Sequence, residues 1–461
     1  MAASLEVDTM SRKLIKPSIP TPEHLRKLRL SLFDQLAVPW YFNVILYYSG
    51  PDDDEKKMNV AERRAELEKS LSEALPSLYL IAGRFIQDDF SIDCGDQGVE
   101  YVEAQVKGKL SEFLQLGPPI ELLDKFLPWD NPPPPKSATS PLLAIQVNTF
   151  DCGGLVLGIK ISHIIADGGS LGQFLNTWAT TCRGIRTNGV TFSSNYEHCV
   201  AKLFPARNPE EAKSLPLLRV PKQTENADTI KIQTARFFFD QAIMAKIIES
   251  AASVKGASPD DLKSTKVVVA LALIWKGFMA LSASKHGHTR DSALSIAMSL
   301  RGRVSTLKIP ENIFGNFCIS VIVSFDAEKD TTELYDLIVL VRDAIRSTIG
   351  RVSQASDSEE ASSVLIECRR SLYEKWDKER EGLMDVYLCS SWRGFPYPMY
   401  GADFGWGKPD WVSVGSQHSQ GVWIMDGSNG DAIEVWVSLE EKDMEKFKQD
   451  PDISAFLSTQ L

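Results

Sequence analysis

Residues 142–169 read LLAIQVNTFDCGGLVLGIKISHIIADGG. Two apolar runs rich in β-branched side chains, 142–150 and 155–162, stand on either side of the turn-forming residues 151–154. Such runs, joined by a short segment with paired glycines, are typical of a β-hairpin. We therefore predict two adjacent antiparallel strands at this point of the chain.

The second predicted strand leads into a histidine. Successive side chains of a strand point to opposite faces of its sheet, so every second residue shares a face. The residues of one face are Leu155, Leu157, Ile159 and Ile161. His163 falls on the same apolar face, which places an imidazole on an interior surface.

Asp167 follows His163 by four residues, with Gly168 and Gly169 directly after it. Because paired glycines are poor residues for a helix interior, we expect a strand end and a tight turn rather than one helical turn between His163 and Asp167. An imidazole with an ordinary pKa of about 6.5 is suited to accept a hydroxyl proton near neutral pH. Asp167 then either orients the ring or holds the turn. The alternative is a buried, hydrogen-bonded histidine and an ordinary turn aspartate.

Residues 168–172, Gly-Gly-Ser-Leu-Gly, also fit the G-x-S-x-G turn of serine hydrolases. The partners available for Ser170 would be His198, His286, His288 and His418. In such enzymes the serine stands directly at the strand end, whereas this strand ends near His163. We therefore favour helix capping for Ser170 and keep a serine hydrolase as the alternative function.

The composition is that of an ordinary globular protein, with 43% apolar and 24% charged residues. At 461 residues the chain is long enough for two domains. The net charge of −11 disfavours binding to nucleic acid or to anionic membranes. Seven scattered cysteines without a CxxC pair indicate reduced thiols, and no targeting signal is legible, so we expect a cytoplasmic protein.

The longest apolar run, 267–283, is interrupted by Lys276. It is shorter than the roughly 20 residues of a membrane span, so we interpret it as a buried helix. No cluster of histidine, cysteine and carboxylate side chains has metal-ligand spacing, and we expect no metal site.

The second half of the chain repeats the mixture of strands and helices. Apolar β-branched runs predict strands at 235–239, 293–298 and 318–325, and helical spacing appears at 241–252. Helical spacing also appears at Gln173 to Cys182. The roughly fifty residues that follow this helix, 183–232, have little periodicity, which indicates a crossover or a linker.

A second unusual string is Asp403-Phe404-Gly405-Trp406-Gly407. Its spacing suits a structural corner better than acid–base chemistry. A protein kinase is excluded because no catalytic-loop string and no glycine-rich phosphate loop precede the Asp-Phe-Gly.

His163 to Gly168 and Asp403 to Gly407, about 240 residues apart, together resemble the paired signatures of the plant BAHD acyltransferase family. The resemblance covers nearly the whole chain and includes further landmarks: Ser31 to Leu36, Leu80 to Arg84, Asp151 to Gly154, Leu300 to Arg303 and Phe314 to Asn316. The layout is most similar to the branch that contains vinorine synthase, salutaridinol acetyltransferase and acylsugar acyltransferases.

The resemblance implies an α/β (α+β) fold with two chloramphenicol-acetyltransferase-like domains. Each would have a mixed β-sheet with flanking helices, and a solvent channel would run between them. The expected division is an N-terminal domain over 1–195, a crossover loop over 196–230 and a C-terminal domain over 231–461, with some segment exchange near 404–425.

The resemblance also implies an acyl-CoA:alcohol O-acyltransferase. His163 would deprotonate the alcohol, and a tetrahedral intermediate would form without a covalent acyl-enzyme. Asp167 would point away from the ligands and pair with Arg301 or Arg303, as structural support for catalysis. Asp403, Gly405 and Gly407 would form a remote supporting corner.

By the same resemblance, Ser390 and Trp392 line the channel near the oxyanion and the acceptor. Lys263, Ser264 and Thr265 contact the CoA phosphates, for which a basic side chain and hydroxyls are suited, although a plain capping segment is the alternative. Acyl-CoA is a co-substrate, and no tightly bound cofactor is expected.

The expected partners are acyl-CoA and a small-molecule alcohol, and a monomer is expected. The expected donor is an acetyl or short branched acyl group, and the expected acceptor is an alkaloid, terpenoid, sugar ester or quinone. A third class, an inactive ligand-binding protein of this fold, would bind CoA or a metabolite without releasing thiol.

Overall fold

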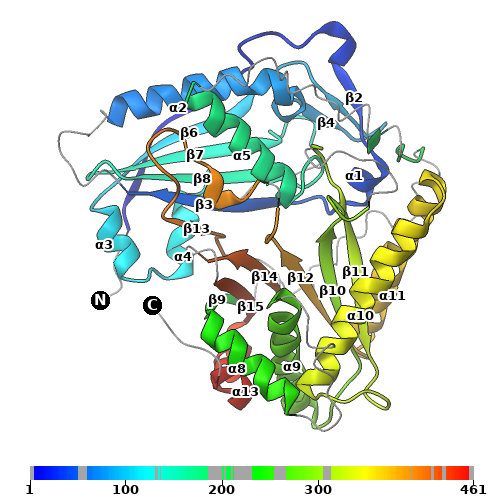
Figure 1. Cartoon of the computed structure of the whole chain (residues 1–461). Helices are drawn as coiled ribbons and strands as arrows, with labels where there is room; N and C mark the ends of the chain where they lie inside the picture. The colour runs from blue at the N-terminus through cyan, green and yellow to red at the C-terminus, as the bar shows by residue number, and fades with distance from the viewer. Residues whose placement is uncertain are drawn as a thin grey trace.

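The structure is a computed structural model of the chain. It describes residues 5–49, 60–129, 133–134, 137–184, 200–201, 204–208, 211, 231–253, 266–304, 313–395, 397–416, 420–427 and 432–455. Two units lie one above the other, each with its own six-stranded sheet and covering helices (Figure 1). The predicted α/β architecture with two mixed sheets is confirmed.

The sheet of the upper unit is mixed, since β6 and β7 are parallel and its other neighbouring strands are antiparallel. In spatial order its strands are β1 (Val7–Ile15), β6 (Val99–Val106), β7 (Leu143–Phe150), β8 (Leu155–Ser162), β3 (Tyr41–Tyr48) and β13 (Trp411–Ser413). Helices α2 (Val60–Ala74) and α5 (Gly168–Cys182) lie side by side over one face (Figure 1).

The predicted hairpin is β7 and β8, which pair in antiparallel register from Leu143 opposite Ile161 to Thr149 opposite Leu155. Gly153 in the turn has φ +83°, a conformation that favours glycine. Both strands are buried along their whole length. The hairpin therefore lies in the core of the sheet, and its second strand delivers His163 to the sheet's end.

The sheet of the lower unit is also mixed, with β12 parallel to both of its neighbours. Its strands in spatial order are β11 (Cys318–Phe325), β10 (Ser292–Ser299), β12 (Asp385–Ser391), β14 (Gly421–Asp426), β15 (Ile433–Glu440) and β9 (Ile232–Phe239). Its helices are α8 (Gln241–Ala252), α9 (Lys266–His286), α10 (Leu334–Gln354), α11 (Ser358–Arg380), α12 (Glu441–Gln449) and α13 (Pro451–Ser454).

Helix α9 contains the longest apolar run. By length and composition it is the one helix of the described residues that could cross a membrane, but 72% of its most apolar window is buried inside the protein. It is an apolar helix of the second hydrophobic core, as the interruption at Lys276 predicted.

The remaining elements are short. A small sheet contains β2 (Lys27–Arg29), β5 (Ser91–Asp93) and β4 (Arg84–Ile86), and the short α-helices are α1 (Leu32–Leu36), α3 (Leu110–Gln115) and α4 (Ile120–Leu123). The 3-10 helices are η1 (Glu23–Leu25), η3 (Leu75–Ala82), η4 (Asp124–Phe126) and η7 (Met399–Gly401).

Two segments pack with the unit that lies far from them in sequence. Strand β13, late in the chain, pairs with β3 of the upper sheet. Conversely, Leu32 and Phe33 of α1 belong to the hydrophobic core of the lower unit. Each unit therefore contributes a piece to the other, and the two are packed as one structure.

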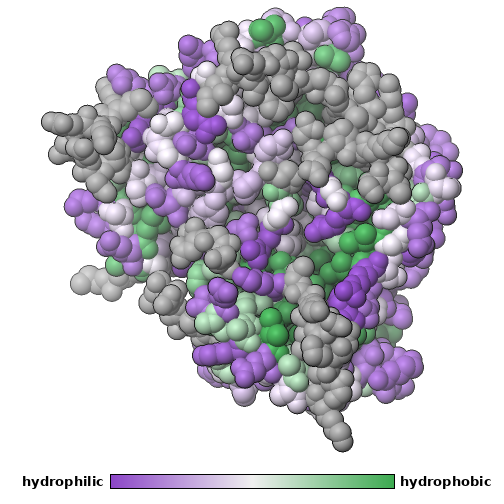
Figure 2. Space-filling model, in the orientation of Figure 1, coloured by the Kyte–Doolittle hydropathy of each residue, from purple (hydrophilic) through white to green (hydrophobic). Residues whose placement is uncertain are grey.

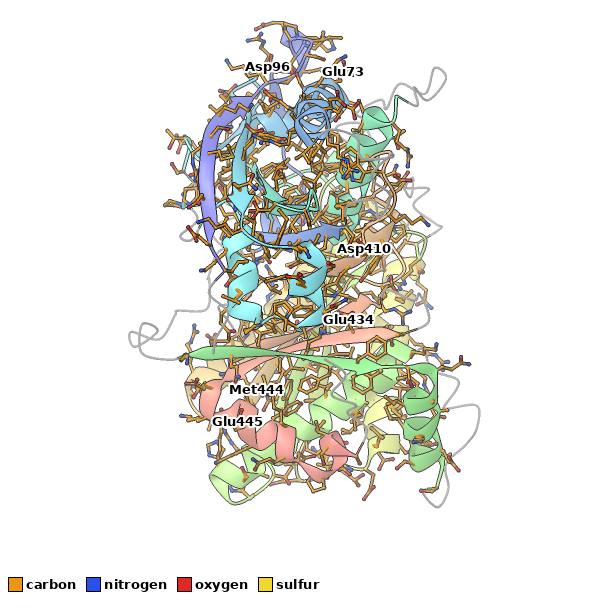
Figure 3. The ribbon with its side chains drawn as sticks, turned by 90° about the vertical axis from the view of Figure 1, so that its left-hand side faces the viewer. Glu73, Asp96, Asp410, Glu434, Met444 and Glu445 are labelled. Atoms are coloured by element: carbon orange, nitrogen blue, oxygen red, sulfur yellow. The ribbon has the colours of Figure 1, made fainter. Side chains whose placement is uncertain are left out.

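The junction of the units is apolar and aromatic. Trp411 of β13 stacks on Tyr47 of the upper sheet at 4.7 Å and on Trp436 of the lower sheet at 6.1 Å between ring centroids. In the side view, the labelled residues Asp410 and Glu434 show where this junction lies (Figure 3). In the space-filling view, hydrophobic residues are visible on this face between the upper and lower units, and polar residues dominate the periphery (Figure 2).

Candidate active site

His163 is the first residue after β8, where the sheet of the upper unit ends. Its backbone N–H donates to the Trp40 carbonyl at 2.8 Å, which continues the pairing of β8 with the segment before β3. The Phe42 ring lies 5.0 Å from the imidazole between centroids. The chain then turns through residues 163–165 and enters α5 at Gly168. The predicted strand end and turn are confirmed, although the helix begins five residues before the predicted start at Gln173.

Asn316, which precedes β11 in the lower unit, contacts this histidine twice. Its side-chain oxygen lies 2.9 Å from Nδ1 of His163, and its Nδ2 donates to the His163 carbonyl at 2.8 Å. An amide oxygen only accepts, so Nδ1 must be the protonated nitrogen of the neutral ring. The lone pair is then on Nε2, for which the described residues provide no hydrogen-bond partner.

The environment of His163 favours its neutral form. Burial lowers the pKa of His163 below the ordinary value, and the positive charge of Arg369 adds to this. The Asp167 carboxylate and the Asn316 hydrogen bond oppose the shift without cancelling it. A neutral imidazole with a lone pair on Nε2 is the form that a general base requires.

Asp167 is the N-cap of α5 and accepts the Ser170 N–H at 2.9 Å. Its other oxygen accepts from Arg301 Nη1 at 2.6 Å and from the Phe317 N–H at 2.9 Å. Burial would raise the pKa of Asp167, but the Arg301 guanidinium and these hydrogen bonds hold it below the ordinary value. Asp167 is therefore an ionised carboxylate that joins the two units.

Of the two arginines predicted as partners of Asp167, only Arg301 makes the contact. Its second terminal nitrogen donates to the carbonyls of Ile313 and Gly315 at 3.1 and 2.9 Å, so the guanidinium also holds the loop before Asn316. Arg303 donates to the Ser299 carbonyl at 2.7 Å and lies outside this network. Among the described residues, no hydrogen bond or ion pair joins Arg303 to Asp167.

Ser170 is fully buried, with 0% of its surface exposed. Its hydroxyl donates to the Gly315 carbonyl at 2.7 Å and accepts the Gly315 N–H at 2.8 Å and an Arg301 N–H at 3.1 Å. The capping prediction for Ser170 was wrong, because Asp167 is the cap. This hydroxyl is turned into the protein, and its hydrogen-bond partners among the described residues include no histidine, which argues against the serine-hydrolase alternative. His198 and His418 lie outside the described residues.

Ser390 and Trp392 lie at the end of β12, where the Trp392 indole donates to the Ser390 hydroxyl at 3.0 Å. The Trp392 ring lies 5.8 Å from Phe42, the ring that contacts His163. Phe395 approaches the turn from the same side, because its ring lies within about 3 Å of where a Cβ at Gly168 would stand. Trp392, Phe42 and Phe395 thus form an aromatic side of the site next to His163.

The Asp403 corner lies in the upper unit, away from His163. One oxygen of Asp403 accepts the N–H groups of Gly405 and Gly407 at 2.8 and 3.1 Å, and both glycines have φ near +108°. Phe404 packs edge-on against Trp178 of α5 at 4.9 Å, and Arg183 lies 3.7 Å from the carboxylate. Asp403 thus caps a tight corner of the backbone, and its role as a remote support for catalysis stays a prediction.

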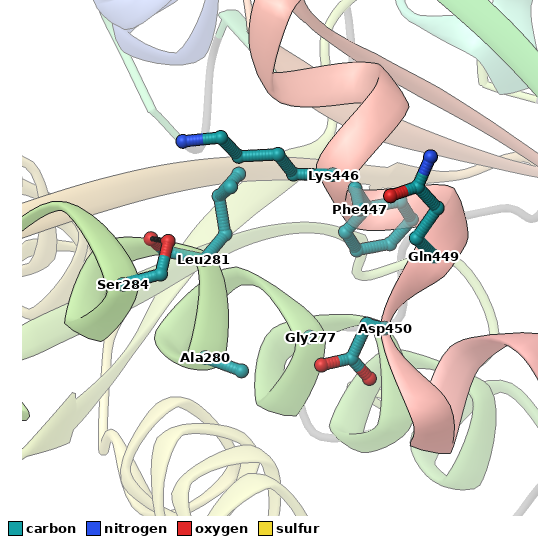
Figure 4. A pocket seen from close by; sticks show the side chains of 8 residues that line it. All are labelled: Gly277, Ala280, Leu281, Ser284, Lys446, Phe447, Gln449 and Asp450. Carbon is teal, nitrogen blue, oxygen red and sulfur yellow. Dashed lines mark hydrogen bonds between the residues drawn. The ribbon is translucent and has the colours of Figure 1, made fainter.

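Lys263, Ser264 and Thr265, the predicted CoA contacts, lie outside the described residues, as does most of the crossover 196–230. Among the described residues no group of three or more metal-binding side chains comes together. A cavity of about 280 Å³ lies between α9 and α12, lined among others by Ser284 and Lys446, and contains none of the predicted site residues (Figure 4).

Sequence reasoning named Asn316 and Asp34 only as parts of family landmarks and gave them no role. Asp34, on α1, accepts both the backbone and the side-chain N–H of Asn316 at 3.0 Å. The sequence signal that could have pointed to them is a polar side chain among large apolar neighbours, which occurs in both of the short strings 31–36 and 313–317. Only the fold shows that the two strings meet behind His163.

Comparison with known proteins gives one consistent result. The family model described as "Transferase family" matches residues 5–453. The acetyl-CoA-benzylalcohol acetyltransferase of Clarkia breweri is 33% identical over 98% of this chain and 100% of its own length. Stemmadenine O-acetyltransferase of Catharanthus roseus is 30% identical over 98% of this chain and 97% of its own length.

Solved structures agree. The crystal structure of vinorine synthase superposes with a TM-score of 0.78 at 28% identity, covering 99% of both chains. The TRI101 protein of F. graminearum, solved with coenzyme A and deoxynivalenol, shares the fold with a TM-score of 0.66 at 15% identity, over 94% of this chain and 99% of its own. The chain therefore belongs to the transferase family and is a plant BAHD O-acyltransferase of specialised metabolism.

Proposed function

We propose that the protein transfers an acyl group from acyl-CoA to a hydroxyl of a small-molecule alcohol, with His163 as the general base. The observation that supports this best is the contact of Asn316 Oδ1 with His163 Nδ1, at 2.9 Å. It leaves Nε2 as the basic nitrogen of a neutral ring at the end of β8. The relatives, among them a benzyl alcohol acetyltransferase, supply the reaction class.

The proposed reaction needs no covalent enzyme intermediate. Nε2 takes the proton of the substrate hydroxyl as its oxygen forms a bond to the thioester carbonyl carbon. The tetrahedral intermediate then expels the CoA sulfur, and the imidazolium returns its proton to the thiolate, so ester and free CoA leave. Asp167 and Arg301 hold the loop that contains Asn316, and they do not exchange protons with substrate.

The donor and acceptor are proposed from the relatives and the aromatic side of the site. Named relatives use acetyl groups, and one of them is a malonyltransferase, so an acetyl or other short acyl group is the donor we expect. Phe42, Trp392 and Phe395 offer apolar ring faces near His163. We expect a largely apolar alcohol as acceptor, such as an alkaloid, a terpenoid, a sugar ester or a quinone.

The CoA contacts, the route of the substrates, and the location and oligomeric state of the protein are proposed from the family resemblance and from the composition. Lys263, Ser264 and Thr265 are proposed to contact the phosphates of CoA, for which an ammonium and hydroxyls are suitable donors. The solvent channel between the units is proposed as the route of both substrates to His163. A cytoplasmic monomer is the proposed state.

A panel of acyl-CoA thioesters assayed against a library of plant alcohols, with detection of free thiol, tests this function. The proposal predicts thiol release that depends on both an acyl-CoA and an alcohol, with an ester product of matching mass, and no release by the His163→Ala variant. Thiol release at equal rates without any alcohol would mean a thioesterase. Equal turnover by His163→Ala would end the assignment of the base.

A further inference from the structure

We infer that Asp34 is a positioning residue for His163: its carboxylate holds the Asn316 amide in the one orientation that keeps the proton on His163 Nδ1. This inference rests on the proposed role of His163 as general base. Asp34 would be the third residue of the site, after His163 and Asn316. It lies on the short helix α1, more than a hundred residues before His163 in the sequence.

The Asp34 carboxylate is occupied on both sides. Oδ1 accepts the backbone and side-chain N–H groups of Asn316 at 3.0 Å each, and Oδ2 accepts the backbone N–H of Ser31 at 3.0 Å and its hydroxyl at 2.6 Å. Only 3% of Asp34 and 1% of Asn316 are exposed. The contact is thus a buried, charge-assisted connection between α1 and the loop before β11.

The two acceptors that surround Asn316 Nδ2 fix the orientation of the amide. Nδ2 has two hydrogens, and it donates one to the His163 carbonyl at 2.8 Å and one to Asp34 at 3.0 Å. If the amide turned over, its oxygen would face both of these oxygens, and its NH₂ would face Nδ1. The proton would then have to move to Nε2, which would no longer be basic.

A simple capping role does not account for Asp34. With Ser31 it forms the capping box of α1, but that helix has only five residues. Burial raises the pKa of Asp34 to about 6 despite these hydrogen bonds, so the ionised form is held at a cost in free energy. An asparagine would fill the same space without that cost, but its own amide has both a donor and an acceptor and would permit either orientation of Asn316.

Other charged and titratable groups also act on this network. His163 is influenced by Asp167 and Arg369, and the Cys318 thiol of β11 is influenced by Asp167, Arg301, Arg369 and Asp34. Burial raises the pKa of that thiol to about 12, so it stays neutral near pH 7. Asp167 keeps its pKa below the ordinary value because Arg301 faces it, so it stays ionised. Asp34 therefore changes charge near pH 6, and His163, whose pKa is lowered by burial, gains its proton on the acid side of its ordinary value.

The test compares Asp34→Asn with Asp240→Asn. Asp240 is the N-cap of α8 in the lower unit, where its side chain accepts the Ile243 N–H, so this control removes the charge of a capping aspartate far from His163. For Asp34→Asn we expect kcat at pH 8 to fall by at least about tenfold, because part of the population has the wrong tautomer. KM for both substrates should stay within about threefold, because the carboxylate contacts no substrate.

The pH profile separates positioning from a structural effect. In the natural protein, kcat should fall on the acid side through two ionisations: Asp34 loses its charge near pH 6, and His163 gains a proton below its ordinary pKa. In Asp34→Asn only one ionisation should remain, whereas Asp240→Asn should keep two. ¹⁵N-labelled histidine, with His163→Gln to identify the signals, should show a proton on Nδ1 in the natural protein and a mixture in Asp34→Asn.

Unchanged kcat and an unchanged acid limb in a folded Asp34→Asn protein would overturn the inference. So would a fall in kcat with a single Nδ1-protonated tautomer in the ¹⁵N spectrum. If Asp34→Asn does not fold, Ser31→Ala, which removes one of the donors to Asp34, should reduce kcat without changing KM. Full activity of His163→Ala would instead remove the proposed function, and the two failures are therefore distinguishable.

Discussion

The side-chain oxygen of Asn316 lies 2.9 Å from Nδ1 of His163, although 153 residues separate the two in sequence. One residue belongs to the lower unit and the other to the upper unit, so the proton position on the histidine depends on how the units pack. The Gly315 carbonyl of the same loop accepts hydrogen bonds from Arg301 and Ser170. The catalytic geometry and the packing of the units are therefore coupled.

Asp167→Asn is expected to destabilise the protein by about 3 to 5 kcal/mol at pH 7, because it leaves the buried Arg301 guanidinium without its anion. The pKa of Asp167 is lowered in the folded protein, so its stabilisation is complete above the unfolded pKa of about 3.9 and is lost as the pH falls through the folded value. Urea unfolding from pH 8 to pH 3 measures this. A difference that stays constant down to pH 3 would contradict the ion pair.

Ser170→Ala should retain most of the activity while losing stability. The change leaves the buried Gly315 N–H without its acceptor, which costs about 1 to 3 kcal/mol. Thermal melting and steady-state rates measure both effects, and a serine-directed phosphonate should leave Ser170 unlabelled. Loss of turnover in a folded Ser170→Ala protein, together with labelling of Ser170, would contradict this prediction and support the serine-hydrolase function instead.

Gly405→Ala should destabilise the Asp403 corner by about 1 to 3 kcal/mol, because Gly405 has φ +108°, where a Cβ is strained. The matched control is Gly350→Ala in the interior of α10, where an added Cβ meets nothing within 4 Å. That control should stabilise by about 0.5 to 1 kcal/mol, because alanine is the better helix residue. Melting temperatures that move in the same direction for both would contradict the role of the corner.

The sequence predicted those elements whose conformation depends mainly on neighbouring residues, such as strands and tight turns. The hairpin was predictable because β-branched runs and paired glycines specify strands and a turn, and β7, β8 and β11 have the predicted bounds to within one residue. The start of α5 was missed because Gly168 and Gly169 were taken as helix breakers. At the first turn of a helix their low propensity matters little once Asp167 supplies the cap.

Contacts between segments that lie far apart in the chain could not be predicted from the sequence. Nothing in the string around Asp34 shows that α1 packs into the core of the lower unit, or that Asn316 meets both Asp34 and His163. The choice between Arg301 and Arg303 also depended on the turn at 301–303, which directs one side chain inward and the other to the Ser299 carbonyl. These features follow from tertiary packing, which periodicity does not report.

Steady-state turnover by His163→Ala, compared with the natural protein under saturating acyl-CoA and the best acceptor alcohol, tests the central claim most directly. We predict a loss in kcat of about 10² to 10⁴ or more, with CoA affinity and melting temperature little changed, because the imidazole contributes proton transfer rather than binding. A folded His163→Ala protein that forms ester at the natural rate would contradict it.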